Sequence, residues 1–340
     1  MLYYEPQSTN PHFNLALEQH LFDTAYARHV FMLWQNDNAI IIGKNQNTEA
    51  EINRQFVEQK GIKVARRLSG GGAVYHDMGN LNFTFIVPDG DDINFQFFCR
   101  PVMQTLAQFG VTAEIRGRND ITIKGKKFSG NAQYRKSGRV MHHGTIMFDS
   151  DLETLQAALS PPAAKLQSKG VASVRSRVTN ISEHLEGGIT LADFKSALAK
   201  NVLPRDFEIY MPDDADTAAI TQLHDELYST WQWNFGASPR YAAQKKRRVE
   251  NCGTLEFYLD INQGKITGIE CYGDYFGDRP VSQLASLLHG CQLRPEAIAA
   301  AIAHIDLGEY FYNLPKEIFI EILCEQGDAN ELADFNRNVK

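Results

Sequence analysis

Several features that mark other protein classes are missing from this 340-residue sequence. Its cysteines are few and odd in number, and they form no Cys-x-x-Cys pair; they are Cys99, Cys252, Cys271, Cys291 and Cys324. No apolar run approaches the ~20 residues needed to cross a bilayer. The first residues have neither the basic region nor the apolar core of a signal peptide. We therefore expect reduced thiols, a cytoplasmic location and no membrane association.

Positive charge and the common phosphate-binding motifs are also missing. The formal net charge is −7, which argues against a general nucleic-acid binder, because such a protein needs a positive surface. A glycine triplet occurs, but no Gly-Lys-Ser/Thr follows it and no G-x-G-x-x-G spacing exists, so a P-loop and a dinucleotide-binding fold are both disfavoured. A hydrophobic content of 43% over this length is enough for a large core and more than one domain.

The most informative stretch runs from Arg66 to Asp77, where Arg66 and Arg67 precede the three glycines Gly70 to Gly72. Glycines have no Cβ, so positive φ angles are accessible and main-chain N–H groups can converge on an anion. The β-branched run 62–68 predicts a strand that delivers this loop to a sheet edge. The arrangement indicates a carboxylate or phosphate site; the alternative is a glycine hairpin with solvated arginines.

A second group of polar residues lies on a predicted antiparallel meander. Residues 121–124, 126–135 and 140–148 have strand composition, and Lys124-Gly125 and Lys136-Ser137-Gly138 are turn signals between them. Because alternate strand residues share a face, we expect Lys127, Ser129 and Asn131 to form one polar floor. The alternative is an ordinary solvent-facing side of an antiparallel sheet.

Other reactive side chains are given less weight. His142 and His143 are adjacent in a strand, so they face opposite sides and cannot bind one metal ion together; one is expected to line the site. Ser69 and Ser129 lack recognisable His and Asp partners for nucleophilic catalysis, so loop and hydrogen-bonding roles are favoured. Cys99 falls in the helical pattern 95–109 and reads as a buried apolar residue.

The motifs, taken together, resemble one family. They occur in the order Arg66-Arg67-Leu68-Ser69-Gly70-Gly71-Gly72-Ala73-Val74-Tyr75-His76-Asp77, Gly117-Arg118-Asn119-Asp120-Ile121, Lys126-Lys127-Phe128-Ser129-Gly130-Asn131-Ala132, His142-His143-Gly144-Thr145 and Ser173-Val174-Arg175-Ser176-Arg177-Val178-Thr179-Asn180, with Trp231-Gln232-Trp233-Asn234-Phe235-Gly236 following. In that order they closely resemble the lipoate–protein ligases of the long type, over nearly the whole chain.

The resemblance implies an ATP-dependent enzyme that converts lipoate to lipoyl-AMP and then passes the lipoyl group to a lysine of an acceptor domain. Its implied fold is the mixed α/β sheet of biotin protein ligases and class II aminoacyl-tRNA synthetases, with a small α/β C-terminal domain. Implied partners are lipoyl domains of 2-oxoacid dehydrogenase complexes and the H protein of glycine cleavage. Lipoate and ATP are the implied substrates, and magnesium accompanies ATP.

Site roles also follow from the resemblance. Lys127 would be catalytic, bridging the lipoyl carbonyl and the α-phosphate, and Asp120 is the candidate magnesium ligand. The remaining residues expected to bind lipoate or ATP are Arg67, Ser69, Gly70, Gly71, Gly72, Ala73, Val74, Tyr75, Asn119, Asp120, Ser129, His143, Gly144, Arg175 and Arg177. Neutralising and orienting negative charge is the main task when a carboxylate approaches a triphosphate, and Arg67 and Lys127 suit it.

Two other functions remain open. One is an octanoyl or lipoyl transferase, or amidotransferase, of the same fold; it would use a cysteine thioester and no ATP, and Cys99 is the only cysteine before Cys252. The other is a non-catalytic lipoate-binding module. The preferred acceptor, the choice between lipoate and octanoate, the base for transfer and the oligomeric state cannot be predicted.

The rest of the chain suggests two domains. The basic, weakly apolar segment 165–179 predicts a lid over the adenylate rather than a linker. The run Lys245-Lys246-Arg247-Arg248 precedes a change of pattern; it reads as a solvated linker or as a patch for an acidic acceptor domain. We place a catalytic domain at 1–248 and an accessory domain at 249–340, the latter with a hairpin of 254–260 and 265–272 followed by helices 280–289, 295–304 and 315–325.

Overall fold

The computed structural model describes residues 1–25, 28–46, 48–90, 94–117, 119–159, 177–235, 243–262 and 264–324. By its internal contacts the chain divides into two compact units. The first unit comprises Met1–Lys44, Thr48–Ser69 and Ala73–Gly236, and the second comprises Asn45–Asn47, Gly70–Gly72 and Ala237–Lys340. The two units are described separately below.

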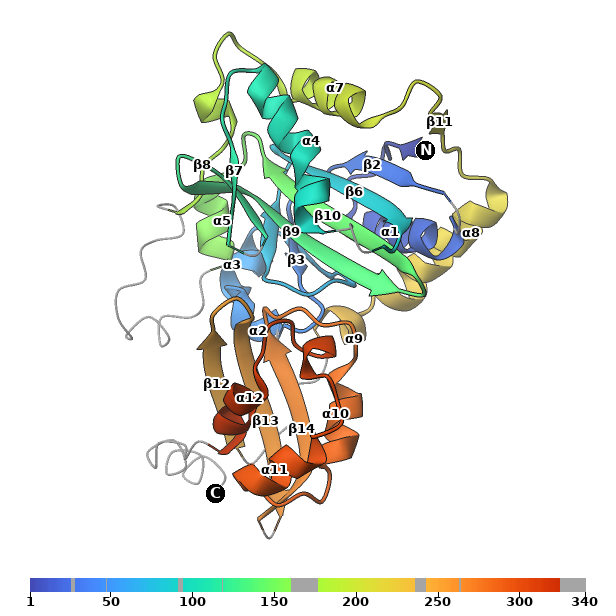
Figure 1. The fold of residues 1–340 in the computed structure, drawn as a ribbon. Helices are drawn as coiled ribbons and strands as arrows, with labels where there is room; N and C mark the ends of the chain where they lie inside the picture. The colour runs from blue at the N-terminus through green and yellow to red at the C-terminus, as the bar shows by residue number, and fades with distance from the viewer. Residues whose placement is uncertain are drawn as a thin grey trace. The chain divides into compact units, whose positions relative to one another are not determined.

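The first unit is built on an eight-stranded mixed sheet of order β11-β1-β2-β6-β10-β9-β8-β7 (Figure 1). Its strands are β1 (Leu2–Tyr4), β2 (Val30–Trp34), β6 (Asn80–Pro88), β7 (Glu114–Arg116), β8 (Asp120–Ile123), β9 (Lys126–Lys136), β10 (Arg139–Met147) and β11 (Glu208–Ile209). The pairs β11/β1 and β1/β2 are parallel, and the remaining pairs are antiparallel. This confirms the predicted mixed α/β class.

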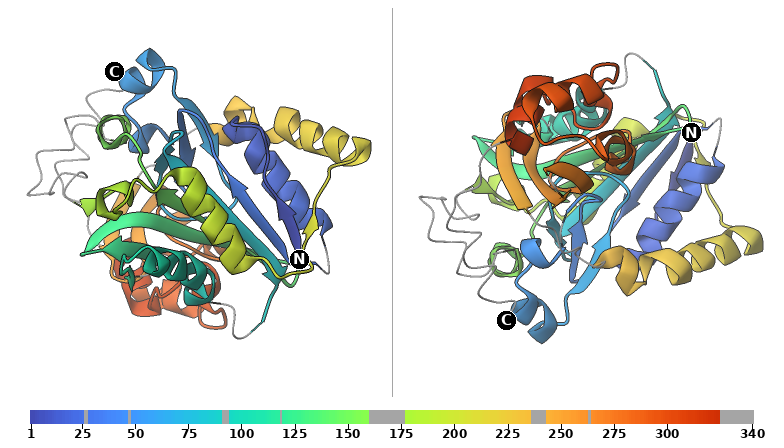
Figure 2. Two further views of the ribbon diagram at one scale, coloured as in Figure 1. Left: turned by 90° about the horizontal axis from the view of Figure 1, so that it is seen from above. Right: turned by 90° about the horizontal axis from the view of Figure 1, so that it is seen from below.

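Helices cover both faces of this sheet, as the two views of Figure 2 show. The helical elements are α1 (Pro11–Thr24), α4 (Phe95–Gln108), α7 (Leu191–Val202), α8 (Asp214–Leu223), α9 (Trp231–Asn234), η2 (Ser182–His184) and the π-helical η3 (His224–Tyr228). All five residues of β2 are buried. Phe31 and Leu33 belong to the core beneath α4 and α7, whereas Val30, Met32 and Trp34 belong to the core beneath α1 and α8. A strand with two buried faces loses the apolar–polar alternation of a half-exposed strand.

A three-stranded sheet of order β4-β3-β5 carries the arginine and glycine segment. It consists of β3 (Ala39–Ile42), β4 (Lys63–Arg66) and β5 (Val74–His76), with the helices α2 (Thr48–Glu51), α3 (Arg54–Gln59) and α5 (Leu152–Ala158). The strand β4 pairs only with β3 within this sheet. The prediction of a strand that brings the loop to a sheet edge is thus confirmed.

The predicted three-strand meander is present as β8, β9 and β10. Lys124 and Gly125 have φ of +50° and +78°, and Ser137 and Gly138 have +53° and +70°. Left-handed pairs of this kind fit two-residue hairpin turns. Cys99 is buried in α4 at 1% exposure, as predicted.

The second unit contains the sheet β12-β13-β14. Its elements are β12 (Ala243–Val249), β13 (Gly253–Asn262), β14 (Lys265–Gly273), α10 (Val281–Leu288), α11 (Pro295–Ala301), η4 (Leu307–Glu309) and α12 (Lys316–Cys324). Leu255, Phe257 and Leu259 alternate along β13 and join Phe311 and Phe319 in one apolar core. The predicted hairpin and three helices are confirmed.

The basic run Lys245–Arg248 is not a linker, because it lies within β12 and pairs with β13. Neighbouring residues of this strand find acidic partners on different elements. Lys246 forms an ion pair with Glu256 of β13 at 3.1 Å, and Arg247 forms one with Glu321 of α12 at 3.0 Å. The predicted boundary near Arg248 falls inside this strand.

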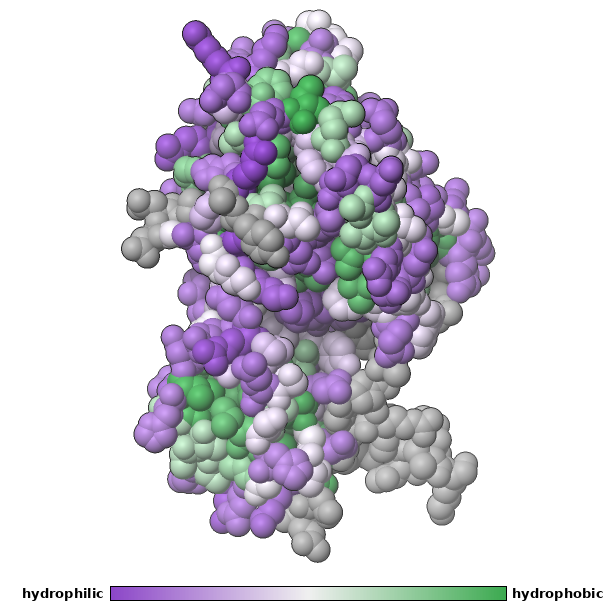
Figure 3. Space-filling model, turned by 90° about the vertical axis from the view of Figure 1, so that its right-hand side faces the viewer, coloured by the Kyte–Doolittle hydropathy of each residue, from purple (hydrophilic) through white to green (hydrophobic). Residues whose placement is uncertain are grey.

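Hydrophilic residues cover most of the face drawn in Figure 3, and hydrophobic ones occupy separate areas of it. Within the ranges that the structure describes, no helix has the length and apolarity required to traverse a bilayer.

Candidate active site

The two neighbouring arginines have different surroundings. Arg66 uses its guanidinium to hold main-chain carbonyl groups: Nη1 donates to Gly43 at 2.8 Å and Nε donates to Trp233 at 2.9 Å. Its Nη2 donates to the hydroxyl of Thr48 at 2.6 Å. Arg66 is therefore a structural cross-link, although the sequence suggested two arginines directed at a ligand.

The same cross-link explains the tryptophan-containing motif near residue 231. Asn234 accepts a hydrogen bond from the main-chain N–H of Arg66 at 2.9 Å. The indole of Trp233 donates to the Arg66 carbonyl at 2.8 Å. This part of the motif fixes the end of β4 and hence the start of the glycine segment.

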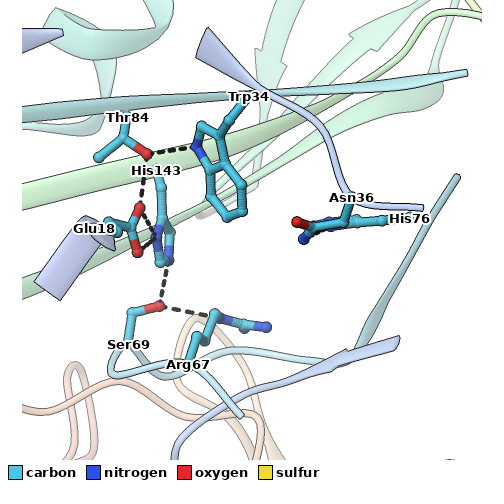
Figure 4. A network of polar contacts seen from close by, with 8 residues as sticks. All are labelled: Glu18, Trp34, Asn36, Arg67, Ser69, His76, Thr84 and His143. Atoms are coloured by element: carbon cyan, nitrogen blue, oxygen red, sulfur yellow. Dashed lines mark hydrogen bonds and ion pairs between the residues drawn. The ribbon is translucent and has the colours of Figure 1, made fainter. Parts of the chain in front are cut away.

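Arg67 points into a buried polar network, shown in Figure 4. Its Nε donates to Ser69 Oγ at 3.0 Å, and Nη1 donates to the Ile41 carbonyl at 3.1 Å. Ser69 Oγ in turn lies 2.6 Å from Nε2 of His143. Burial lowers the pKa of Arg67 to about 10, so the guanidinium still carries its charge at neutral pH.

The network ends on a buried carboxylate from α1. Nδ1 of His143 lies 2.9 Å from Glu18 Oε1, and Thr84 donates to the same oxygen at 2.7 Å. The indole of Trp34 donates to Thr84 at 2.9 Å. Along this network Arg67 donates to Ser69, Ser69 donates to His143, and His143 donates to Glu18. A buried cation and a buried carboxylate are thus joined through hydrogen bonds.

Ser69, His143 and Glu18 thus stand in the order of a catalytic triad, which sequence reasoning did not detect. The Ser69 oxygen already accepts from a guanidinium, however, and this interaction draws electron density from the atom that would have to attack. The geometry favours the hydrogen-bonding role predicted for Ser69.

The two adjacent histidines face opposite sides of β10, as predicted. His142 stacks on Phe98 with ring centroids 4.5 Å apart and on Phe83 at 5.9 Å, whereas His143 contacts Glu18 and Ser69. Burial, and then the neighbouring His143, hold the pKa of His142 well below its usual value.

Lys127 lies on the other face from Ser129 and Asn131, so the predicted common polar floor is wrong. Asn131 donates to Ser129 at 3.2 Å, while a Cβ added to the intervening Gly130 would lie 2.9 Å from Lys127 Nζ. The physical reason is a register shift: Ile121 pairs with Ser129, but the next residue of β8 pairs with Lys127. One extra residue of β9, Phe128, reverses the alternation.

Ser129 and Gly144 consequently lie on the core side. Ser129 has no exposed surface. A Cβ on Gly144 would lie 2.3 Å from Asn131 Oδ1 and 2.5 Å from the Phe83 ring, so glycine is required there for packing.

Asp120 and Asn119 differ in their contacts. Asp120 Oδ1 forms an ion pair with Lys127 Nζ at 2.8 Å. Asn119 donates to the Asn131 carbonyl at 2.7 Å and accepts from Asn131 through its own carbonyl at 3.1 Å, so it braces β9.

The residues predicted to hold magnesium can be compared with what such an ion needs. Within the described parts of the chain, no group of three His, Cys, Asp or Glu side chains could hold a metal. A nucleotide-bound magnesium needs as few as one protein carboxylate, and Asp120 offers one.

The glycine segment is conformationally special at Gly71, whose φ of +89° is unfavourable for other residues. The following Val74 and Tyr75 belong to β5. The Tyr75 side chain packs in the apolar core of the small sheet, and Tyr75 pairs with Ile40 of β3 in the ladder.

The predicted lid falls almost wholly outside the described residues, since 160–176, with Arg175, are not among them. Arg177 is exposed. Val178 forms a parallel bridge to Lys127, and Thr179 donates to the Lys127 carbonyl at 2.9 Å. The chain after the predicted lid is therefore attached to the lysine strand.

The geometry so far gives Lys127 in an ion pair with Asp120 and Arg67 within a buried polar network. Residues 10–203 match the family model "Lipoyl protein ligase A/B catalytic domain", and residues 238–323 match "Bacterial lipoate protein ligase C-terminus". The chain belongs to the lipoate–protein ligase family. It is an enzyme of that type.

Individual relatives span nearly the whole length of this ligase. It is 42% identical over 331 residues to "Lipoate-protein ligase LplJ" of Bacillus subtilis, which covers 95% of this chain and 100% of the relative. Its fold is similar to a P. falciparum LipL1 structure in complex with lipoate, with a TM-score of 0.80, 26% identity and coverage of 98% of this chain and 99% of the other.

Two shorter solved structures match the ligase in part. A lipoate-protein ligase A bound with ATP has a TM-score of 0.59 at 26% identity and covers 69% of this chain and 98% of its own. A bi-partite ligase from Thermoplasma acidophilum, described with its E2 lipoyl domain, has a TM-score of 0.60 at 26% identity and covers 71% and 98%.

Sequence reasoning missed three residues of this ligase's network: Glu18, Trp34 and Thr84. Glu18 lies in an apolar helical pattern and Thr84 in an apolar strand. The sequence did offer one indication for Glu18, which is a charged residue within an apolar helical pattern. A buried carboxylate requires partners, so a polar network could have been expected there.

Proposed function

We propose that the first unit forms lipoyl-AMP from lipoate and ATP at the site of Lys127 and Arg67, and then transfers the lipoyl group to a lysine of a lipoyl acceptor domain. The observation that carries the proposal is the position of Lys127. Its ammonium lies over Gly130, on the face of the sheet that also presents His143 towards Glu18 and Ser69.

In the first step a carboxylate oxygen of lipoate attacks the α-phosphorus of ATP, and pyrophosphate leaves. Negative charge increases on the non-bridging oxygens, where an ammonium and a guanidinium stabilise it best. Lys127 has the flexible reach for this task, and Asp120 holds its Nζ at 2.8 Å. Arg67 is fixed by Ser69 and Ile41, so little reorganisation is needed when the ligand arrives.

In the second step the amine of the acceptor lysine attacks the carbonyl carbon of the mixed anhydride, and AMP leaves. Asp120 would hold the magnesium that neutralises the phosphates of ATP. The main chain of Gly72 to Tyr75 and the residues Arg175 and Arg177 would bind the nucleotide.

The second unit is proposed as an accessory domain. Because β12 belongs to its sheet, a test protein lacking this unit should end before Ala243 rather than within the basic run. Lipoyl domains of 2-oxoacid dehydrogenases and the H protein are the proposed acceptors; the T. acidophilum ligase described with its E2 lipoyl domain supports the first of these.

A thioester-forming transferase is the second candidate, and Cys99 argues against it. Burial raises the pKa of its thiol to about 12, and the side chain is 1% exposed. A cysteine nucleophile needs to be accessible and readily deprotonated.

Release of pyrophosphate from ATP with free lipoate, followed by label transfer to an acceptor panel, tests the proposal. We expect both. A transferase would modify the acceptor from an acylated donor protein without releasing pyrophosphate, and a binding module would do neither.

A further inference from the structure

His76, on β5, has one ring nitrogen satisfied and one unpaired. The side chain is 3% exposed. Nδ1 lies 3.0 Å from Nδ2 of Asn36, whereas Nε2 has no hydrogen-bond partner within the residues that the structure describes. Because a buried polar atom without a partner is destabilising, such an atom suggests a ligand contact.

The orientation of the Asn36 amide follows from its other neighbour, Asn14. Nδ2 of Asn14 lies 2.9 Å from the carbonyl oxygen of Ser8 and 3.0 Å from that of Gln35. Carbonyl oxygens only accept, so Asn14 must present its nitrogen to them. The same nitrogen lies 3.0 Å from Asn36 Oδ1, and Asn36 therefore turns its own nitrogen to His76.

This chain of donors fixes the His76 tautomer. Since Nδ1 accepts from Asn36, the single proton of the neutral imidazole must be on Nε2. Burial, then Arg67 and His143, lower the pKa of His76 to about 3, and the ring stays neutral. Nε2–H is thus a buried donor that is held ready by Asn14 and Asn36.

A second unpaired donor lies on β6. Nδ2 of Asn82 has no partner in the described part of the chain, and its oxygen accepts from Asn80 at 3.0 Å. Asn82 pairs in the ladder with Trp34 on one side and Thr145 on the other. The Trp34 ring meets His76 edge-on at 6.4 Å.

Thr145 connects this region to the lysine. Its hydroxyl accepts from the main-chain N–H of Gly130 at 3.1 Å, and the Lys127 ammonium lies over Gly130. One row of the sheet therefore leads from Trp34, which the His76 ring contacts, through Asn82 and Thr145 to Gly130.

We propose that Nε2–H of His76 donates to the carboxylate of the acyl substrate, and that Asn14 and Asn36 are positioning residues that set its tautomer. The inference rests on the proposed assignment of this site to lipoate. An oxygen acceptor is favoured over the dithiolane sulfur because sulfur is a weak acceptor.

Binding of lipoate and of octanoate to the full-length protein tests the acceptor. The variants are His76→Phe, with His29→Phe as the matched control at an exposed position. We expect His76→Phe to raise Kd about 10- to 100-fold for both acids, with the control unchanged. No change, or a loss confined to lipoate, would overturn the inference. Failure of the wild-type protein to bind either acid would instead contradict the proposed function.

Nitrogen-15 NMR of the histidine rings tests the tautomer without relying on a substrate. The wild-type protein should show His76 protonated at Nε2 alone, and Asn36→Asp should move a proton to Nδ1, because a carboxylate accepts where the amide donated. A wild-type signal with the proton on Nδ1 would overturn the inference even if the variants failed to fold.

Discussion

The hydroxyl of Ser69 lies 2.6 Å from Nε2 of His143, whose Nδ1 lies 2.9 Å from Glu18. This relationship joins the segment after β4 to β10 and to helix α1, three segments that are distant in sequence. It leaves His143 with an accepting Nε2 and lets Ser69 accept from Arg67 at the same time.

Glu18→Gln should disturb that relationship, because the nitrogen of a glutamine amide would face the N–H of His143 in either orientation. We expect the free energy of unfolding to fall by about 1–3 kcal/mol and lipoyl-AMP formation to slow by about 10-fold. Denaturant unfolding and initial rates measure the two effects. The exposed Glu186→Gln is the control, and wild-type stability of Glu18→Gln would contradict the assigned network.

Arg66→Ala should act mainly on stability. The substitution removes the donor shared by the Gly43 and Trp233 carbonyls and by the Thr48 hydroxyl. We expect a loss of about 3 kcal/mol or more, since several buried acceptors are left unpaired. Thermal and urea unfolding check this, and a change below about 0.5 kcal/mol would show that the cross-link is unimportant.

Stability should also fall in acid because of buried neutral histidines. The folded-state pKa of His142 is well below its ordinary value, and that of His76 is about 3. Above about pH 6.5 both rings are neutral in the folded and in the unfolded chain, so neither lowers the free energy of unfolding there. As pH falls below that value, the unfolded chain binds protons that the folded chain excludes. Each such histidine should lower the free energy of unfolding by about 1.4 kcal/mol for each pH unit.

Urea unfolding between pH 7 and pH 5 measures that slope. His142→Phe should reduce this pH dependence of the unfolding free energy by the contribution of one histidine. The reduction should appear whatever effect the substitution has on stability at pH 7. An unchanged slope would mean that His142 is protonated in the folded protein.

Gly130→Ala should displace the Lys127 ammonium, because the new methyl group would lie 2.9 Å from Nζ and 3.0 Å from Cε. We expect adenylate formation to fall at least 10-fold with little change in unfolding. In a double-mutant cycle, Gly130→Ala should add no further loss to Lys127→Ala. Independent losses would indicate that Gly130 acts through another group.

Much of the fold was predictable because its signals are local. Turn residues such as Gly125 and Gly138 and the breaks at glycine and proline delimit the meander and the second unit. Opposite orientations of His142 and His143 followed from strand geometry alone.

The errors in the site arise from non-local packing. The extra residue Phe128 in β9 carries no sequence signal, yet it turns Lys127 away from Ser129. The structural use of Arg66 depends on Trp233 and Asn234, some 170 residues later. His143, the partner of Ser69, comes from β10, and Glu18, the partner of His143, comes from α1; composition could not place either beside the glycine segment.

The most direct test of the central claim is pyrophosphate release by Lys127→Ala with saturating lipoate and ATP, compared with Lys126→Ala at the exposed neighbouring position. If Lys127 stabilises the charge that develops at the α-phosphate, its removal lowers the rate by about 10²–10³-fold, while Lys126→Ala stays near the wild-type rate and both variants unfold like the wild type. Adenylate formation by Lys127→Ala at the wild-type rate would contradict the account.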